Sequence, residues 1–274
     1  MQYEYFSLNG QLRPIENANI SIFNLEYSYG FGVYETIRVS KGTIYFLDDH
    51  CSRLINSASV IGLDHNFDHE FIKQSVHKLI EKNETQTTNI KILLIGGDTK
   101  NSASMYITCL NPLFPDRKII HSGAHAITKK YERIFPQAKT LNMLPSYLAY
   151  REAKAMGAFD ALFIDNQENI MEGSRTNILA LRGNDLVSPI ESKILPGVMR
   201  SKVIKVAKSN GYEYSESNIP LKSIGEYDAL FLTSATSKII PLKSLDDVQL
   251  KGSWDNLNRL MSLLNDYLKD YSKT

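Results

Sequence analysis

The chain has 274 residues, with 31 lysines and arginines against 30 aspartates and glutamates, so its formal net charge is +1 at pH 7. This length allows two modest domains, and the balanced charge argues against binding to nucleic acid or to an anionic membrane surface. Hydrophobic residues at 43% and charged residues at 22% are ordinary globular values, which exclude a disordered or fibrous chain.

Cysteine and histidine usage excludes two further classes of protein. The two cysteines, Cys51 and Cys109, are too few for a disulfide framework or a four-cysteine zinc site. The six histidines show no metal-type pairing with acidic residues, so we expect no metal. The first 20 residues lack the pattern of a signal peptide, and no stretch is long and apolar enough to span a bilayer. We expect a soluble, cytoplasmic α/β protein.

The first part of the chain is predicted to combine antiparallel strands with two helices. Asn9-Gly10 within residues 4–14 is a strong hairpin signal, and Lys41-Gly42 marks a turn between two strands in residues 27–47. Apolar residues recur at helical spacing after Asp48, a candidate cap. The pattern therefore predicts helices over residues 48–63 and 69–83, followed by strands over 90–97 and 104–111.

A short segment with two prolines separates the two predicted domains. Pro112 and Pro115 disfavour both a helix and a central strand. We therefore predict a small α/β domain over residues 1–111, a linker over 112–117 and a larger domain over 118–274.

The second part is predicted to alternate short strands with three helices. Pro145 suits the first turn of a helix that Gly157 ends, and Gly183-Asn184 is a tight-turn signal. The helices are expected over residues 145–157, 198–211 and 253–271, and the strands over 118–128, 159–165, 175–189 (broken by the turn) and 227–242.

Lys139 is the most informative residue for chemistry, because the chain has no nucleophile elbow, H-E-x-x-H motif or P-loop lysine. It lies between Pro136 and Pro145 in a segment of small and apolar residues just before a helix. Partial desolvation of a lysine lowers its pKa and makes the amine a usable nucleophile or base. A solvated loop lysine is the alternative interpretation.

Candidate charged partners lie elsewhere in the chain. Glu172, at a strand junction, is either an exposed edge residue or a fixed anion that keeps a basic ring nitrogen protonated. A helix that starts at Pro196-Gly197 presents backbone amides suited to a phosphate, and arginine can clamp a phosphate with two hydrogen bonds. The alternative interpretations are an ordinary turn at Pro196-Gly197, a polar loop at Ser234-Ala235 and a surface charge at Arg53. The phosphate candidates are Arg53, the amides of Val198 and Met199, and the Ser234-Ala235 stretch.

Six segments in this order resemble the class IV aminotransferase family, the fold-type IV pyridoxal-phosphate enzymes. The segments are GVYETIRV (32–39), HCSRL (50–54), KTLNML (139–144), MEGSRTNIL (171–179), ILPGVMR (194–200) and TSATS (233–237). The resemblance implies a two-domain α/β (α+β) fold. A small N-terminal α/β sandwich would join a larger C-terminal barrel-like domain, with pyridoxal 5′-phosphate at the interface. It also implies a homodimer in which a loop of the partner subunit completes each active site.

The resemblance also assigns roles to the candidate residues. Lys139 matches the lysine that forms an aldimine with the cofactor and later moves the proton between Cα and C4′. Glu172 matches the acid that pairs with the pyridine nitrogen, and Tyr34 matches a residue on the substrate side. Arg53, the Val198 and Met199 amides and Ser234-Ala235 match the phosphate cup.

The substrate is less closely defined than the cofactor. The chain has Leu144 where branched-chain enzymes carry a tyrosine, and residues 96–104 lack the Arg-x-His pair of D-amino acid aminotransferases. Arg38 shares a strand face with Tyr34, and Arg175 follows Glu172 by three residues, so either arginine is a candidate for the substrate carboxylate. The expected activity is transfer of an amino group between an amino acid and a 2-oxo acid. Aminodeoxychorismate lyase, and a cofactor-free binding protein, are the alternatives.

Overall fold

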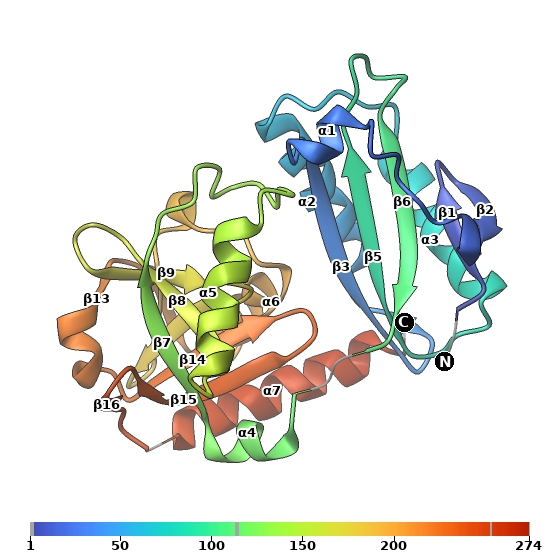
Figure 1. Ribbon diagram of the computed structural model, residues 1–274. Helices are drawn as coiled ribbons and strands as arrows, with labels where there is room; N and C mark the ends of the chain where they lie inside the picture. The colour runs from blue at the N-terminus through green and yellow to red at the C-terminus, as the bar shows by residue number, and fades with distance from the viewer. Residues whose placement is uncertain (1–2, 113–114, 253, 274) are drawn as a thin grey trace. The chain divides into compact units, whose positions relative to one another are not determined.

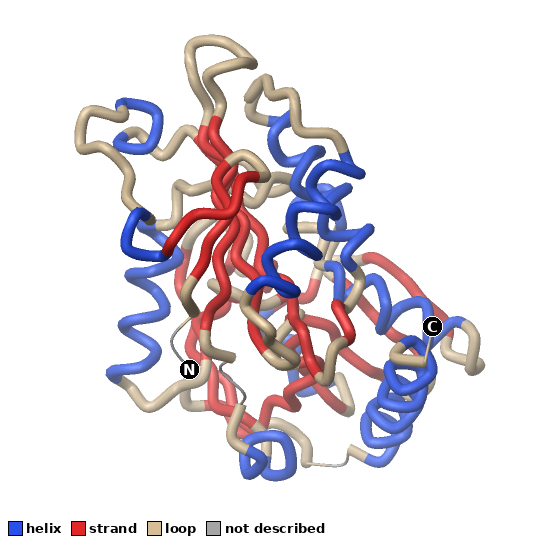
Figure 2. Tube along the Cα trace, turned by 90° about the vertical axis from the view of Figure 1, so that its right-hand side faces the viewer, coloured by secondary structure: helices blue, strands red, loops and turns tan. Residues whose placement is uncertain are grey.

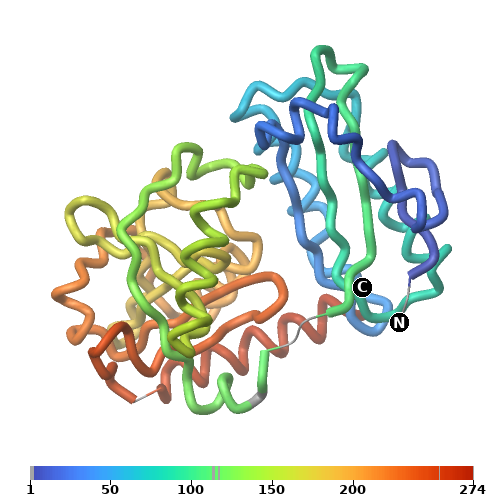
Figure 3. Tube along the Cα trace, in the orientation of Figure 1, coloured from blue at the N-terminus to red at the C-terminus, as the bar shows by residue number. Residues whose placement is uncertain are grey.

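The computed structural model describes residues 3–112, 115–252 and 254–273, which form two compact units. The first unit contains residues 1–113 and 137–143, and the second contains 114–136 and 144–274. Figure 3 lets the chain be followed through each unit by colour. Residues 137–143, which carry Lys139, belong to the first unit although they lie beyond the expected end of the small domain at residue 111. Residues 113 and 114 of the expected linker lie outside the described residues.

The first unit is a six-stranded antiparallel sheet with two helices on one face. The strands follow the order β2-β1-β6-β5-β3-β4, and helices α2 and α3 pack against β3, β6 and each other (Figures 1 and 2). The positive φ angles of Asn9 and Gly10 form the predicted hairpin turn between β1 and β2. The elements are β1 (Tyr5–Leu8), β2 (Gln11–Pro14), η1 (Ile15–Asn17), α1 (Leu25–Ser28), β3 (Gly32–Ser40), β4 (Thr43–Ile44), α2 (Leu47–Val60), α3 (His69–Lys82), β5 (Thr88–Ile95) and β6 (Ser104–Leu110).

Buried and half-buried side chains alternate along β3, so one face of the strand belongs to the core and the other, here called the open face, is partly accessible to solvent. Val33, Ile37 and Val39 are fully buried and join the core formed with α2 and α3. Tyr34, Thr36 and Arg38 alternate with them and are only half-buried. The period of two along the strand therefore places Tyr34 and Arg38 on the same face, as predicted.

The second unit is built on a closed ring of strands. The strands β10, β14, β15, β7, β8 and β9 follow one another in the sheet, and a pairing of β9 with β10 closes the ring. This matches the expected barrel-like domain. The elements are α4 (Arg117–Ser122), β7 (Ala124–Lys130), α5 (Leu144–Ala155), β8 (Asp160–Ile164), β9 (Asn169–Gly173), β10 (Asn177–Arg182), β11 (Asp185–Ser188), η2 (Glu191–Lys193), α6 (Val198–Lys208), β12 (Glu213–Glu216), β13 (Ile219–Pro220), η3 (Leu221–Glu226), β14 (Ala229–Ser234), β15 (Lys238–Leu245), β16 (Val248–Gln249) and α7 (Asp255–Tyr271).

Two predicted strands of the second unit are wrong in detail. The strand expected over 118–128 is helix α4 followed by β7, because Asp116 caps the helix and Gly123 breaks the chain direction at φ 77°. In residues 227–242, the expected strand that ends in small hydroxyl residues is β14, which ends at Ser234, but a tight turn and a second antiparallel strand, β15, follow it. Among the described residues, no helix combines the length and the apolar character needed to cross a membrane.

Candidate functional site

Lys139 is held in the first unit by main-chain hydrogen bonds on both sides. The Tyr34 amide donates to the Lys139 carbonyl at 2.9 Å, and the Leu141 amide donates to the Gly32 carbonyl at 2.8 Å. The Lys139 amide in turn donates to Ser57 Oγ of α2 at 3.1 Å. The segment thus extends the sheet beside the beginning of β3. Because residue 139 makes these hydrogen bonds through its main-chain atoms, its position does not depend on the lysine side chain.

The Lys139 side chain lies over Tyr34 on the open face of the sheet. Its Nζ is 4.5 Å from the centre of the Tyr34 ring, and Nζ of Lys91 is 5.9 Å from the same ring. Arg38 shares this face, and partial burial lowers the pKa of its guanidinium. Three cationic side chains on one side of the sheet make this face suitable for a carboxylate.

Arg53 of α2 is bound to a buried carboxylate of β3. Its Nε donates to Oε1 of Glu35 at 2.7 Å, and its Nη2 donates to Oε2 at 2.8 Å. His50, one turn earlier on α2, contacts the same carboxylate through Nδ1 at 2.7 Å. Arg53 was predicted from the sequence as a phosphate ligand, whereas Glu35 and His50 had no predicted role.

Glu172 lies in the second unit, where the ring of strands closes. It is the β9 residue that pairs with Asn177 of β10, and it is only 3% exposed. Its Oε1 accepts a hydrogen bond from Nε of Arg133 at 2.6 Å, and its Oε2 accepts one from the Leu195 amide at 3.3 Å. Arg133 also donates to Ser146 Oγ at 3.0 Å. The carboxylate is therefore fixed in position and charge-paired, which is not the geometry of an exposed edge residue.

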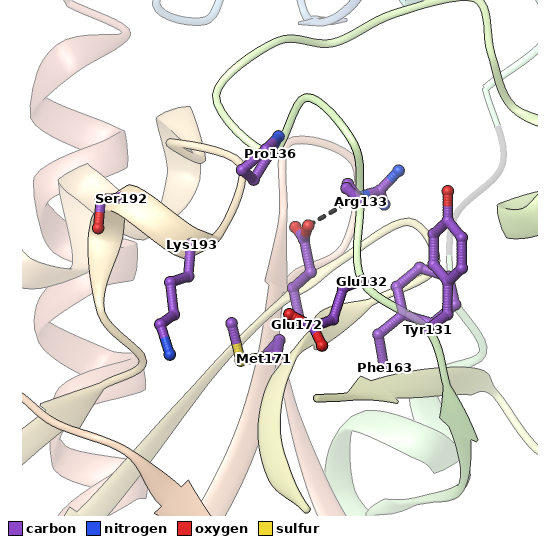
Figure 4. A pocket seen from close by; sticks show the side chains of 9 residues that line it. All are labelled: Tyr131, Glu132, Arg133, Pro136, Phe163, Met171, Glu172, Ser192 and Lys193. Atoms are coloured by element: carbon purple, nitrogen blue, oxygen red, sulfur yellow. Dashed lines mark hydrogen bonds and ion pairs between the residues drawn. The ribbon is translucent and has the colours of Figure 1, made fainter. Parts of the chain in front are cut away.

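A pocket of about 140 Å³ opens beside Glu172. Figure 4 shows the Arg133–Glu172 ion pair on one side of this pocket and Lys193 with Met171 on another. The lining residues are Tyr131, Glu132, Arg133, Pro136, Phe163, Met171, Glu172, Ser192 and Lys193.

Asn177 connects Glu172 to the two predicted anion-binding segments of the second unit. It pairs with Thr233, the residue before Ser234, and its Nδ2 donates to the Leu195 carbonyl at 2.8 Å. A Cβ at Gly197 would collide with the Asn177 side chain, so a glycine is required there. The start of α6 and the end of β14 thus lie next to the Glu172–Asn177 pair.

The start of α6 and the turn after β14 have the features expected of a phosphate site. Within the described chain, no side chain caps the α6 N-terminus, where Val198 and Met199 are the first helical residues. At the end of β14, Ser234 Oγ accepts a hydrogen bond from the Ser237 amide at 3.1 Å, which shapes the turn containing Ala235. Backbone amides at a helix start favour an anion.

The Arg175 side chain contacts aromatic residues of its own unit. It lies in the turn between β9 and β10, is exposed, and is not among the residues that line the pocket. Its guanidinium lies 4.0 Å from the centre of the Tyr150 ring and donates to the Phe159 carbonyl at 3.1 Å. Both of these partners of the Arg175 side chain belong to the second unit.

Two residues of this region were missed by the sequence analysis. Arg133 lies six residues before Lys139, and Asn177 lies within the MEGSRTNIL segment. An arginine in a short polar loop and an asparagine at a strand start have no distinctive pattern. The only available signal was their position within or beside segments already recognised.

The chain belongs to the class IV aminotransferase family, because the model of that family matches residues 32–245. It is 29% identical over 248 residues to the D-alanine aminotransferase of Bacillus licheniformis, covering 87% of both chains. It is also 29% identical over 251 residues to a putative branched-chain-amino-acid aminotransferase of Methanocaldococcus jannaschii, again covering 87% of both. A solved structure of the branched-chain amino acid aminotransferase from Thermobaculum terrenum, in its PLP-containing holo-form, has the same fold. Its TM-score is 0.85 at 23% identity, and the match covers 99% of this chain and 95% of that one.

Proposed function

We propose that this protein is a pyridoxal-phosphate-dependent aminotransferase that moves an amino group between an amino acid and a 2-oxo acid. The observation that carries the proposal is the charge-paired Glu172 carboxylate beside a pocket, in a chain of the aminotransferase family. The named relatives are aminotransferases, which favours this activity over the aminodeoxychorismate lyase alternative.

The residues present fit pyridoxal phosphate. Glu172, paired with Arg133, suits a protonated ring nitrogen, while the uncapped start of α6 suits a phosphate. When bound, the cofactor supplies an aldehyde for the amino group and a ring that withdraws electrons from Cα. The proposed phosphate ligands are the Val198 and Met199 amides, Ser234, Ala235 and Arg53.

Lys139 is the proposed catalytic residue, and it is also the proposed point of covalent attachment. Its primary amine would take up the proton released from the substrate Cα as a general base, and would later donate it as a general acid. The hydrogen bonds that the main chain of Lys139 makes with β3 and with Ser57 Oγ of α2 fix the position from which the side chain works. Positioning of this kind supports proton transfer because it removes the entropy cost of finding the geometry.

A half-reaction with an amino donor tests the proposed activity. Addition of an amino acid without any 2-oxo acid is expected to bleach the visible absorbance of the purified holoprotein, and a 2-oxo acid is expected to restore it. D-alanine and L-leucine are the first donors to compare, because the named relatives are D-alanine and branched-chain aminotransferases. A protein that releases pyruvate and 4-aminobenzoate from aminodeoxychorismate, without bleaching by any donor, would be the lyase instead.

The α-carboxylate of the substrate is proposed to bind Arg38 or Arg175. Arg38 has the stronger support, because it shares the open sheet face with Tyr34, the proposed substrate-side residue. Loss of a charge-assisted pair of hydrogen bonds costs about 1.5–3 kcal/mol, so Arg38→Ala is expected to raise the donor KM about 10-fold to 100-fold with a smaller change in kcat.

The same measurement on Arg175→Ala separates the two arginines. If only Arg175→Ala raises the donor KM, Arg175 takes the role, and if neither variant does, both are removed from the substrate site. Arg182→Ala, an exposed arginine at the end of β10, is the matched control and should behave as the unmodified protein.

We further propose a homodimer in the cytoplasm. Ile22, Phe23 and Tyr29 are 84–87% exposed, which is unusual for large apolar side chains on one short segment and supports a contact with a second copy. The free thiols of Cys51 and Cys109 are typical of a reducing compartment.

A further inference from the structure

Glu35 is a carboxylate on a strand face that is otherwise apolar. It lies on β3 between Val33 and Ile37, which are fully buried, and it is itself 0% exposed. Burial of a charged group without compensation costs several kcal/mol. A polar partner or a function must therefore account for its presence in this face.

Two side chains of α2 compensate the charge of Glu35. Arg53 and His50 are three residues apart, so both project from the same side of the helix toward β3. Burial raises the pKa of Glu35, but the charges and hydrogen bonds of Arg53 and His50 outweigh it and hold the pKa well below its usual range. Glu35 is therefore an anion. Its two carboxylate oxygens accept hydrogen bonds of 2.7 and 2.8 Å from the Arg53 guanidinium.

His50 completes the arrangement as a neutral donor. It is 1% exposed, and burial lowers its pKa more than Glu35 raises it, with the charges of Arg53 and Lys139 acting in the same direction as burial. A neutral imidazole has one N–H group, and the 2.7 Å contact assigns that group to Nδ1, which donates to Oε2 of Glu35. His50 thus fixes the carboxylate that fixes Arg53.

We propose that Glu35 is a positioning residue that orients Arg53 toward the phosphate group of the cofactor, with His50 supporting Glu35. The inference rests on the proposed function, in which Arg53 binds that phosphate. A guanidinium has five N–H groups, and two of them point at Glu35, so the carboxylate determines the direction in which the others face. A free arginine side chain loses rotamer entropy when a ligand orders it, whereas the pair with Glu35 already orders Arg53 before any ligand binds.

If Glu35 only neutralised the charge of Arg53, the expected change in phosphate affinity on removing Glu35 would have the opposite sign. A carboxylate also cancels the charge of Arg53, so its removal would strengthen phosphate binding if charge alone mattered. If orientation matters more, its removal weakens binding. The sign of the change in affinity therefore distinguishes positioning from neutralisation.

The test is Glu35→Gln, with affinity measured by absorbance titration of the cofactor-free protein. We expect the Kd for pyridoxal phosphate to rise about 10-fold to 100-fold, as for loss of a charge-assisted hydrogen bond. The Kd for pyridoxal, which has no phosphate, should stay unchanged. Arg53→Ala should show the same phosphate-dependent loss, and the double variant Glu35→Gln/Arg53→Ala should lose little more than Arg53→Ala alone.

Three results would overturn the inference. An unchanged or tighter Kd for pyridoxal phosphate in Glu35→Gln excludes a positioning role. Equal losses for pyridoxal and pyridoxal phosphate indicate a general structural role, as do additive losses in the double variant. Thermal unfolding of each variant shows whether it is folded. If Glu35→Gln does not fold, His50→Leu is used, and a smaller but phosphate-dependent loss is expected.

Failure of the proposed function gives different results. An unmodified protein that does not bind pyridoxal phosphate overturns the function itself and this inference with it. An unmodified protein that binds the cofactor, with Arg53→Ala binding equally well, removes Arg53 from the phosphate site and overturns only the assignment on which Glu35 depends.

Discussion

Replacing Lys139 with alanine is expected to lower kcat by about 10³-fold or more, because the variant loses both the covalent anchor and the general base. The fold should persist. The hydrogen bonds that tie residue 139 to Tyr34 and Ser57 use main-chain atoms, which alanine retains. Loss of the contact between Nζ and the Tyr34 ring is expected to lower the free energy of unfolding by only about 0.5–1 kcal/mol.

The measurements are steady-state turnover, the visible absorption spectrum and the mass of the peptide containing residue 139 after borohydride reduction. Reduction should add the cofactor to Lys139 of the unmodified protein and leave the variant without it. Lys130→Ala, an exposed lysine at the end of β7, is the matched control and should keep full turnover. Full turnover in Lys139→Ala would remove this residue from the mechanism.

Replacing Glu172 with glutamine has the second largest expected effect. A carboxylate near a basic ring nitrogen raises the pKa of that nitrogen by about 1–3, and a neutral amide does not. The variant is therefore expected to lower kcat about 10-fold to 10³-fold, because the ring is less often protonated at neutral pH. The shape of the side chain is preserved, so the pocket should keep its size.

The stability of Glu172→Gln decides how its kinetics are interpreted. Arg133 loses its anionic partner but keeps Ser146 Oγ and the Ser174 carbonyl as acceptors, so a loss of about 1–3 kcal/mol in the free energy of unfolding is expected. Glu213→Gln, an exposed carboxylate on β12, is the matched control. Unchanged kcat in a folded, cofactor-loaded Glu172→Gln would exclude the proposed role.

The sequence predicted the turns and helices that are determined by residues close together in the chain. The hairpin at Asn9-Gly10, the shared face of Tyr34 and Arg38, and helices near residues 47–60, 69–82 and 255–271 follow from turn chemistry and periodicity. The helix α4 was missed because residues 118–128 are apolar enough for a strand. Its signals, a capping aspartate and Gly123, are short.

The partners of the site residues were beyond prediction, since they depend on tertiary contacts. Glu35 lies one residue from Tyr34 in a recognised segment, yet only the packing of α2 on β3 shows that it holds Arg53. Arg133 and Glu172 are 39 residues apart and meet because β7, which precedes Arg133, and β9, which carries Glu172, both pair with β8. Spacing along one chain contains no such information without an alignment.

The two units cannot be separated by a single cut of the chain. The first unit is discontinuous, since residues 137–143 leave the second unit, add to the edge of β3 and return to begin α5 at Leu144. A fragment cut after residue 113 would therefore lack the strand-like segment that covers Gly32–Tyr34, together with its amine. The first 113 residues alone are therefore not a self-contained module. Separate expression, gene splitting or domain exchange has to keep residues 137–143 with the first unit.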